Sequence, residues 1–224
     1  MKKPLLLIAL GILLLSFYQK DASAQGEPEK SKATRYEIGA QFSSITFEPG
    51  HTQPGAGARF TFNFNDNAAL EAELNYFPND SGIASGDRTN GRVTQGLFGV
   101  KAGKRFRNLG IFAKARPGFI SFSRGIGDVI ITGPPLASGA FPQADFRQRR
   151  LTHPAIDLGG VLEFYPSRRL VTRFDLGATL IRVGETTFQG FAAGPNDTVV
   201  VAPITLPGGT RSSFQFSAGI GYRF

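Results

Sequence analysis

The sequence predicts an all-β protein, an eight-stranded antiparallel up-and-down transmembrane β-barrel. Three observations predict this fold class. Apolar and polar residues alternate with a period of two in eight successive segments, short and long connections alternate between the segments, and charged residues recur in mid-segment. Hydrophobic residues make up 41% of the chain, which is too many for a disordered protein.

The N-terminus has the features of a cleaved signal peptide. Lys2 and Lys3 precede the apolar run Leu5–Phe17, and Ala22-Ser23-Ala24 supplies the small residues that signal peptidase needs. The alternative is a membrane anchor, but the run is shorter than the about 20 residues that a spanning helix needs. We therefore expect a signal peptide at 1–24, a flexible polar tail at 25–33 and the barrel domain at 34–224. The formal net charge falls from +8 to +6 when the signal peptide is removed.

Each of the eight segments sets apolar residues on one face against small, polar or charged residues on the other. In the third, Leu70, Ala72 and Leu74 alternate with Glu71 and Glu73. The fifth is less regular, because Phe112 and Phe122 fall on its polar side and Pro117 cannot donate to a strand ladder, so we expect a bulge or a locally broken pairing there. The predicted strands are 34–47, 55–65, 68–77, 92–106, 111–123, 154–165, 170–183 and 212–224.

The connections predict the topology. Those after the second, fourth and sixth strands are turn-like (65–67, 107–110 and 167–169), whereas those after the first, third, fifth and seventh are longer (48–54, 78–91, 124–153 and 184–211). Short periplasmic turns and long extracellular loops are typical of outer-membrane barrels. The two longest loops are rich in glycine and proline and contain no clear element of their own.

The apolar face can point inward, as in a soluble lipocalin-like barrel, or outward to lipid. The charges favour the outward arrangement, because they are nearly balanced in sign and are able to pair inside a narrow lumen. The predicted lumenal ion-pair network comprises Arg59, Glu71, Glu73, Lys101, Lys114, Arg116, Asp157, Glu163, Arg173 and Asp175.

Two further features favour the same arrangement. Glycines share the polar face and make room for long charged neighbours, among them Gly39, Gly99, Gly103, Gly159, Gly177, Gly219 and Gly221. Aromatic residues mark the strand ends, as in the girdles at membrane interfaces: Tyr36, Tyr76, Phe77, Phe106, Phe164, Tyr165, Tyr222 and Phe224.

The last strand carries the most specific resemblance. Phe214-Gln215-Phe216-Ser217-Ala218-Gly219-Ile220-Gly221-Tyr222-Arg223-Phe224 alternates apolar residues and closes on phenylalanine. It resembles the C-terminal strand of the small outer-membrane β-barrel superfamily that includes the OmpA transmembrane domain, OmpX and OmpW. The resemblance implies that the barrel-assembly machinery recognises Phe214, Phe216, Tyr222 and Phe224 as an assembly signal.

A catalytic or metal site finds little support in the sequence. There is no cysteine, and the two histidines, His51 and His153, are too few for a histidine-based metal site beyond two ligands. The glycine-rich loop segments lack the context of a phosphate-binding motif. We therefore expect no enzyme activity, no cofactor, no metal and no nucleic-acid partner.

The sequence thus predicts a monomeric, non-enzymatic barrel in the bacterial outer membrane with a side-chain-filled lumen. Its role would be surface contact or envelope integrity through the long loops, where Arg147, Arg149 and Arg150 would contact lipopolysaccharide. The alternatives are a narrow porin-like channel for small or apolar solutes, an adhesive surface module and a soluble periplasmic lipocalin-like barrel.

Overall fold

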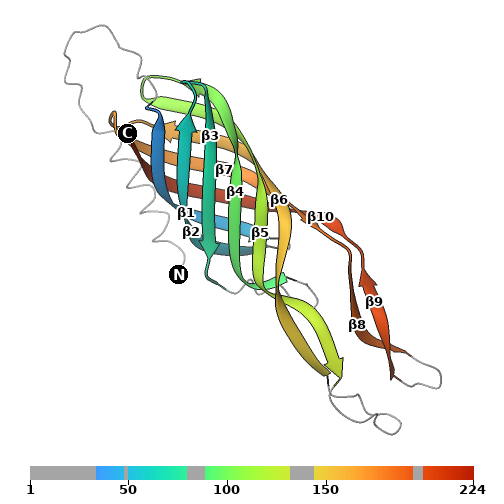
Figure 1. Ribbon diagram of the computed structural model, residues 1–224. Coiled ribbons are helices and arrows are strands. Elements are labelled where there is room, and N and C mark those ends of the chain that lie inside the picture. The colour runs from blue at the N-terminus through green and yellow to red at the C-terminus, as the bar shows by residue number, and fades with distance from the viewer. Residues whose placement is uncertain (1–33, 48–49, 80–88, 132–143, 194–198) are drawn as a thin grey trace, which may run out of the picture.

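The computed structural model describes residues 34–47, 50–79, 89–131, 144–193 and 199–224, in which all regular structure is β-strand (Figure 1). The predicted signal peptide (1–24) and tail (25–33) lie outside these residues and stay predictions. Eight strands form a closed antiparallel barrel in the order β1-β10-β7-β6-β5-β4-β3-β2. They are β1 (Tyr36–Phe47), β2 (His51–Asn63), β3 (Ala68–Phe77), β4 (Thr89–Arg105), β5 (Leu109–Ile131), β6 (Ala144–Phe164), β7 (Leu170–Val183) and β10 (Gly209–Arg223).

The predicted eight-stranded up-and-down barrel is confirmed. Each barrel strand pairs with its neighbour in sequence, except that β7 is followed in the barrel by β10, and β10 closes the sheet onto β1. The closing ladder runs from Glu37–Arg223 to Thr46–Phe214 without a shift of register. The described part of the chain contains no helix long and apolar enough to cross a membrane.

Short turns gather at one end of the barrel, here called the short-turn end, as predicted. Asn65 and Ser167 stabilise two of these turns, because their side chains accept hydrogen bonds from the backbone N–H groups two and three residues later in the chain. Asn65 Oδ1 accepts from the N–H groups of Asn67 and Ala68, both at 2.8 Å. Such side-chain-to-backbone bonds stabilise tight turns locally.

The first connection is shorter than predicted. Residues 48–54 were expected to form a loop, but β2 begins at His51 and its ladder with β1 continues up to the Phe47–His51 pair. Gly50 closes this hairpin with a φ of 99°, and its N–H donates to the Phe47 carbonyl at 2.7 Å. The segment His51–Pro54 has no alternation of apolar and polar residues, so its sequence does not predict a strand. It is a strand because it pairs with β1.

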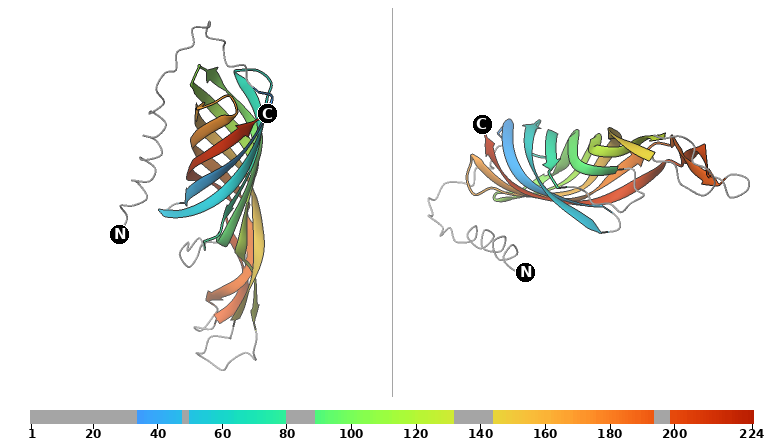
Figure 2. Two further views of the ribbon diagram at one scale, coloured as in Figure 1. Left: turned by 90° about the vertical axis from the view of Figure 1, so that its left-hand side faces the viewer. Right: turned by 90° about the horizontal axis from the view of Figure 1, so that it is seen from below.

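The prediction that the two longest connections contain no element of their own is also largely wrong. Between residues 124 and 153, β5 and β6 continue past the barrel and pair from Gly125–Arg149 to Ile131–Ala144. Between residues 184 and 211, β8 (Thr186–Ala193) and β9 (Val199–Leu206) form a separate hairpin. Figures 1 and 2 show that the β5–β6 extension and the β8–β9 hairpin leave the barrel at the same end, here called the loop end.

Pro117 affects its strand in one of the two ways expected. The β4–β5 ladder passes from Leu97–Gly118 to Val100–Ala115 without the two pairs between them, and the register on both sides of this gap is the same. Pairing is therefore locally broken and no bulge forms at this position. On the other side of β5, Pro117 faces Ile156 of β6 in a continuous ladder.

Apolar side chains point outward and charged ones point inward. Ile38, Phe98 and Ile220 are 56%, 56% and 65% exposed, whereas the charged side chains of Glu71, Arg116 and Arg173 are completely buried. This distribution is the reverse of that in a soluble lipocalin-like barrel and excludes that alternative. Polar residues fill the interior because alternation places every second residue of each strand there.

Two of the predicted girdle aromatics lie in the lumen instead. Phe77 is fully buried and Tyr165 is 8% exposed. The two off-pattern residues of the fifth segment are lumenal as well, because Phe112 and Phe122 are 3% and 2% exposed. The other aromatics named for the girdles face outward or lie at the wall: Tyr36, Tyr76, Phe106, Phe164, Tyr222 and Phe224.

Candidate functional site: the lumen

Ten charged side chains predicted to share the lumen all lie in it. They come from six consecutive strands, β2 to β7, and each is at most 4% exposed. Alternation places them on the inner face, and closure of the barrel brings strands from opposite walls within reach of one another. They are Arg59, Glu71, Glu73, Lys101, Lys114, Arg116, Asp157, Glu163, Arg173 and Asp175, which we call the lumenal network.

Arg173 is the centre of one half of this network. Its guanidinium binds Glu71 across the lumen through both Nη atoms, with Nη2 2.9 Å from Glu71 Oε2. The same guanidinium binds Asp175 two residues along β7, at 2.7 Å from Nε and 2.8 Å from Nη2. Lys101 pairs with Glu163 and lies 3.3 Å from Glu71. Each acid here therefore has at least one cation against it.

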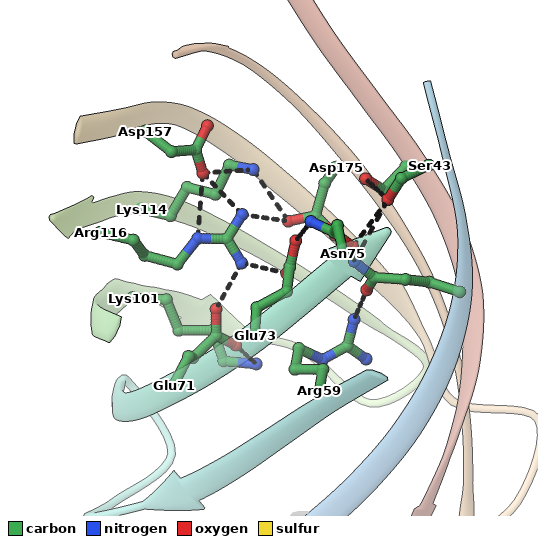
Figure 3. Close-up of polar contacts among 12 residues, drawn as sticks. Ser43, Arg59, Glu71, Glu73, Asn75, Lys101, Lys114, Arg116, Asp157 and Asp175 are labelled. Atoms are coloured by element: carbon green, nitrogen blue, oxygen red, sulfur yellow. Dashed lines mark hydrogen bonds and ion pairs between the residues drawn. The ribbon is translucent and has the colours of Figure 1, made fainter. Parts of the chain in front are cut away.

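Arg116 is the centre of the other half (Figure 3). Its Nη1 donates to Glu73 at 2.5 Å, and its Nε and Nη2 donate to Asp157 at 3.0 and 2.6 Å. Lys114 lies between Asp157 and Asp175, at 3.0 and 3.2 Å from their oxygens. A contact of 3.6 Å between Arg116 and Glu71 joins the two halves. Nine of the ten residues are therefore joined by ion pairs into one continuous cluster, and Arg59 pairs with Glu37 instead.

Several of these pairs cross the lumen between strands that are not neighbours in the barrel. Glu71 of β3 reaches Arg173 of β7, and Lys101 of β4 reaches Glu163 of β6. An eight-stranded barrel is wide enough only for side chains to fill it. The cross-lumen pairs accordingly occupy the space that a solute would need.

The short-turn end of the lumen holds three charged residues that the predicted set omitted. Glu37 pairs with Arg59 at 3.1 Å and faces Arg223 at 3.6 Å, and Arg105 lies 3.6 Å from Glu163. Arg105 also donates through Nε to the Tyr165 hydroxyl at 2.9 Å. Glu37 and Arg223 occupy the polar register of their strands, so the alternation already contained the signal for both.

Next to the network lies a layer of uncharged hydrogen-bonding side chains, which we call the amide layer. Asn75 is central: it accepts hydrogen bonds from Gln41 at 2.9 Å and Ser43 at 3.1 Å, and it donates to Gln95 at 2.8 Å. The predicted lumenal set contains only charged residues and therefore omits this layer, although the layer lies on the same polar faces. Its buried members are Gln41, Ser43, Asn75, Gln95, Thr179, Gln215 and Ser217.

The loop end of the lumen is closed by apolar side chains, which we call the apolar cap. Phe47 and Phe122 are in contact there, with ring centroids 5.8 Å apart. The sequence predicted a polar inner face interrupted by Phe112 and Phe122 of the fifth segment, and the cap corrects that expectation for the residues at the loop end of several strands. Its members are Ile45, Phe47, Phe77, Val93, Ile120, Phe122, Ala155, Ile181 and Val183.

The glycines of the inner face do two different things. A Cβ at Gly39 would lie 2.9 Å from the Ile220 carbonyl oxygen and 3.2 Å from Arg59 Nη2, and one at Gly221 would lie 2.8 Å from Val171 Cγ1 and 3.0 Å from Glu37 Oε1. These two glycines therefore leave room for charged neighbours, as predicted, as well as for the adjacent strand. At Gly99 and Gly159 a side chain would instead meet the backbone of the adjacent strand. These positions permit close backbone approach, which the sequence did not distinguish from the first role.

The remaining predicted residues lie outside the lumen. Phe214, Tyr222 and Phe224 are 54%, 44% and 60% exposed on the outer wall, and Phe216 is half-buried there, so all four face the side open to a partner. Arg147, Arg149 and Arg150 lie in strand β6, not in a loop as expected. Because successive residues on a strand point to opposite faces, Arg149 and Arg150 do not form one surface. The roles in assembly and in lipopolysaccharide contact stay predictions.

The two histidines are not brought together by the sheet. His51 begins β2 and pairs with Phe47, whereas His153 lies in β6 opposite Ile120. Among the side chains that the structure describes, no group of three or more histidine, aspartate or glutamate residues is arranged to hold a metal ion.

A closed barrel with an apolar outer wall and a buried ionic lumen is a β-barrel of the outer-membrane type. The solved structures that resemble it are of the same type. Ail of Yersinia pestis, in complex with the heparin analogue sucrose octasulfate, matches 86% of this chain and 99% of its own, with 12% identity and a TM-score of 0.45. OprG of Pseudomonas aeruginosa matches 86% and 97%, with 11% identity and a TM-score of 0.45.

Neisserial surface protein A matches 84% of this chain and 96% of its own, with 13% identity and a TM-score of 0.43. Neither a family model nor a curated protein matches the sequence. At these identities and TM-scores the likeness is one of fold, and it does not say what this chain binds.

Proposed function

We propose that this chain is a monomeric, non-enzymatic outer-membrane protein whose barrel anchors the two hairpins at its loop end. One observation carries the proposal: the charged side chains are sealed inside while the outer wall is apolar. In water this arrangement would expose many large apolar residues, whereas in a bilayer it matches both environments. The predicted signal peptide supports export to that membrane.

Two measurements test the membrane location. Detergent-folded protein should migrate faster on a gel before heating than after it, because the closed barrel resists unfolding until it is boiled. Fractionation of cells should recover the mature chain with the outer membrane. A folded monomer that stays in solution without detergent would contradict the proposal.

A closed lumen is the second part of the proposal. The lumenal network, the amide layer and the apolar cap follow one another along the barrel, and each contains side chains that are fully buried. The rival function, a narrow channel, requires a path past all three. Planar-bilayer recordings separate the two: we expect no stable single-channel steps from the wild type, and large, reproducible steps would establish the channel instead.

The surface role is assigned to the β5–β6 extension and the β8–β9 hairpin, because they are the described parts that leave the barrel at the loop end. The paired residues of the strand ladders show where the extension and the hairpin can each be shortened. Gly125 pairs with Arg149 and Val183 pairs with Gly209, so residues 126–148 or 184–208 can each be replaced by an Asn-Gly turn. Both variants should keep heat-modifiable migration and lose surface binding or envelope integrity. A phenotype unchanged by either deletion would contradict this role.

Two partners complete the proposal. Recognition of the last strand by the assembly machinery predicts that Phe224→Ala reduces the amount of folded barrel in cells more than it reduces refolding of purified protein in detergent. Equal loss of folded Phe224→Ala barrel in cells and in detergent would indicate a stability defect only.

Lipopolysaccharide contact through Arg147, Arg149 and Arg150 predicts weaker binding of lipopolysaccharide when all three become glutamine.

A further inference from the structure

The short-turn end of the barrel carries most of the excess positive charge. Of the formal +6 left after removal of the predicted signal peptide, this rim accounts for four charges. Five exposed cations lie on it against one acid, Asp66, in the residues that the structure describes there. The cations are Arg35, Lys104, Arg107, Arg168 and Arg169. The segment 25–33 adds two acids and two lysines, so it leaves this balance unchanged.

The rest of the chain is close to neutral. The lumen holds seven cations and six acids among the described side chains, and they are engaged with one another. The remaining residues of the sequence, outside the lumen, the short-turn rim, the segment 25–33 and the predicted signal peptide, carry eight cations and seven acids. The short-turn rim therefore differs from both regions in having almost no acids to balance its cations.

The rim cations surround the barrel. Arg35 precedes β1, Lys104 and Arg107 flank the β4–β5 turn, and Arg168 and Arg169 lie in the β6–β7 turn. These three sites are spread around the circumference, because β1 lies two strands from β7 on one side and three strands from β4 on the other. A ring of this kind fits many small anions around the barrel better than one compact ligand.

Contacts with aromatic rings indicate the depth of the rim cations in the membrane. Arg35 lies over the Phe62 ring with its guanidinium carbon 5.5 Å from the ring centroid, and Lys104 lies over Phe106 at 5.7 Å. Aromatic girdles mark the level of lipid headgroups in outer-membrane barrels. Cations in contact with such rings lie at the depth of the phosphate groups, and each basic residue near an anionic surface adds to the attraction.

We propose that the short-turn rim binds the phosphates of anionic phospholipids in the periplasmic leaflet. This inference rests on the proposed membrane location, and the leaflet follows because short turns face the periplasm. Binding is electrostatic and therefore depends on salt. A soluble anionic polymer is the alternative occupant, but the contacts between cations and girdle rings favour ligands at membrane depth.

The test uses the refolded mature chain in phosphatidylcholine vesicles with spin-labelled lipids. Electron paramagnetic resonance measures how strongly spin-labelled phosphatidylglycerol is preferred over spin-labelled phosphatidylcholine at the protein surface. We expect a preference of about threefold or more at low salt, which 1 M NaCl largely removes. The double variant Lys104→Gln/Arg107→Gln should lower this preference by roughly twofold.

The matched control is Arg182→Gln/Arg211→Gln, which removes two exposed cations from the ends of β7 and β10 farthest from the short turns. These residues belong to no binding site proposed above, so the preference should fall by less than it does in Lys104→Gln/Arg107→Gln. An equal effect of the two double variants, or no preference in the wild type, would overturn the inference. So would binding to soluble polyphosphate that depends on Lys104 and Arg107 without any lipid preference.

The two proposals fail in different ways. If the chain does not enter the bilayer, no immobilised lipid signal of either headgroup is seen, and the membrane location fails with it. If immobilised lipid is present without a headgroup preference, only the rim assignment fails. Heat-modifiable migration of both double variants checks that they are folded.

Discussion

The lumen and the outer wall are made by the same strands, yet different forces hold them. On β4, Lys101 is buried against two acids while Phe98, three residues earlier, is 56% exposed on the wall. A lumenal residue depends on particular partners, because a buried charge without a partner is strongly destabilising. A wall residue depends only on the solvent around it. The lumen therefore requires particular residues at particular positions, whereas the wall requires only that its residues be apolar.

Arg173→Met should have the largest effect and tests the lumenal side of this comparison. It leaves Glu71 and Asp175 buried without their main cation, and breaking such a pair lowers the free energy of unfolding by about 3–5 kcal/mol. Urea unfolding in phospholipid vesicles, followed by circular dichroism, measures the loss. The exposed control Arg149→Met should change stability by less than about 0.5 kcal/mol. Similar losses in the two variants would mean that the network contributes little.

Phe98→Arg tests the wall, and its effect should be somewhat smaller. Phe98 lies halfway along β4 opposite Ala72, so its side chain meets the middle of the bilayer. An arginine on the lipid face at this depth costs about 2–4 kcal/mol, whereas on a wall facing water it would cost less than about 0.5 kcal/mol. The same vesicle assay measures it, with Phe98→Leu as control. A neutral Phe98→Arg would break the comparison, because the wall would then face water.

Ile45→Val probes the apolar cap, where the lumen resembles an ordinary protein core. Ile45 is fully buried, and removing one methylene should lower the free energy of unfolding by about 1 kcal/mol. Conductance in planar bilayers should stay absent, because the network and the amide layer still fill the lumen. Stable channel steps in this variant would show that the cap alone closes the barrel.

Ser217→Ala should have the smallest effect and probes the amide layer. Its hydroxyl lies 2.8 Å from that of Ser43, but Ser43 keeps its hydrogen bond to Asn75 at 3.1 Å. Loss of one such bond, with the partner still satisfied, should lower stability by about 0.5 kcal/mol. Denaturant titration beside Arg173→Met measures the difference. A loss as large as that of Arg173→Met would show that uncharged lumenal groups are as demanding as charged ones.

Sequence reasoning located the ten charged residues of the lumenal network but not their partners. Alternation alone says that Glu71 and Glu73 share a face. It does not say that Arg173 binds Glu71 while Arg116 binds Glu73, because those pairs join strands that are not neighbours in the barrel. The amide layer was not predicted for a different reason: Gln95 and Asn75 carry no charge, so a prediction based on ion pairs does not include them.

The loops show where sequence patterns failed. The β5–β6 extension and the β8–β9 hairpin lie in segments rich in glycine and proline, where we expected no element. In the β5–β6 extension, pairing continues a ladder that the barrel has already aligned, up to Ile131–Ala144, whereas β8 and β9 pair with each other in a separate sheet. The first connection was misassigned for the same reason, since the ladder extends through Pro54 to His51.

The sequence by itself determined the number of barrel strands, their antiparallel order and which side chains share a face. These properties are local, because a period of two along each strand and the turn residues between strands fix them. Only the tertiary structure decided how far the strands extend, which charges meet across the lumen and where apolar residues close it. Those properties depend on the closure of the sheet, which brings together residues such as Glu71 and Arg173 that lie 102 positions apart.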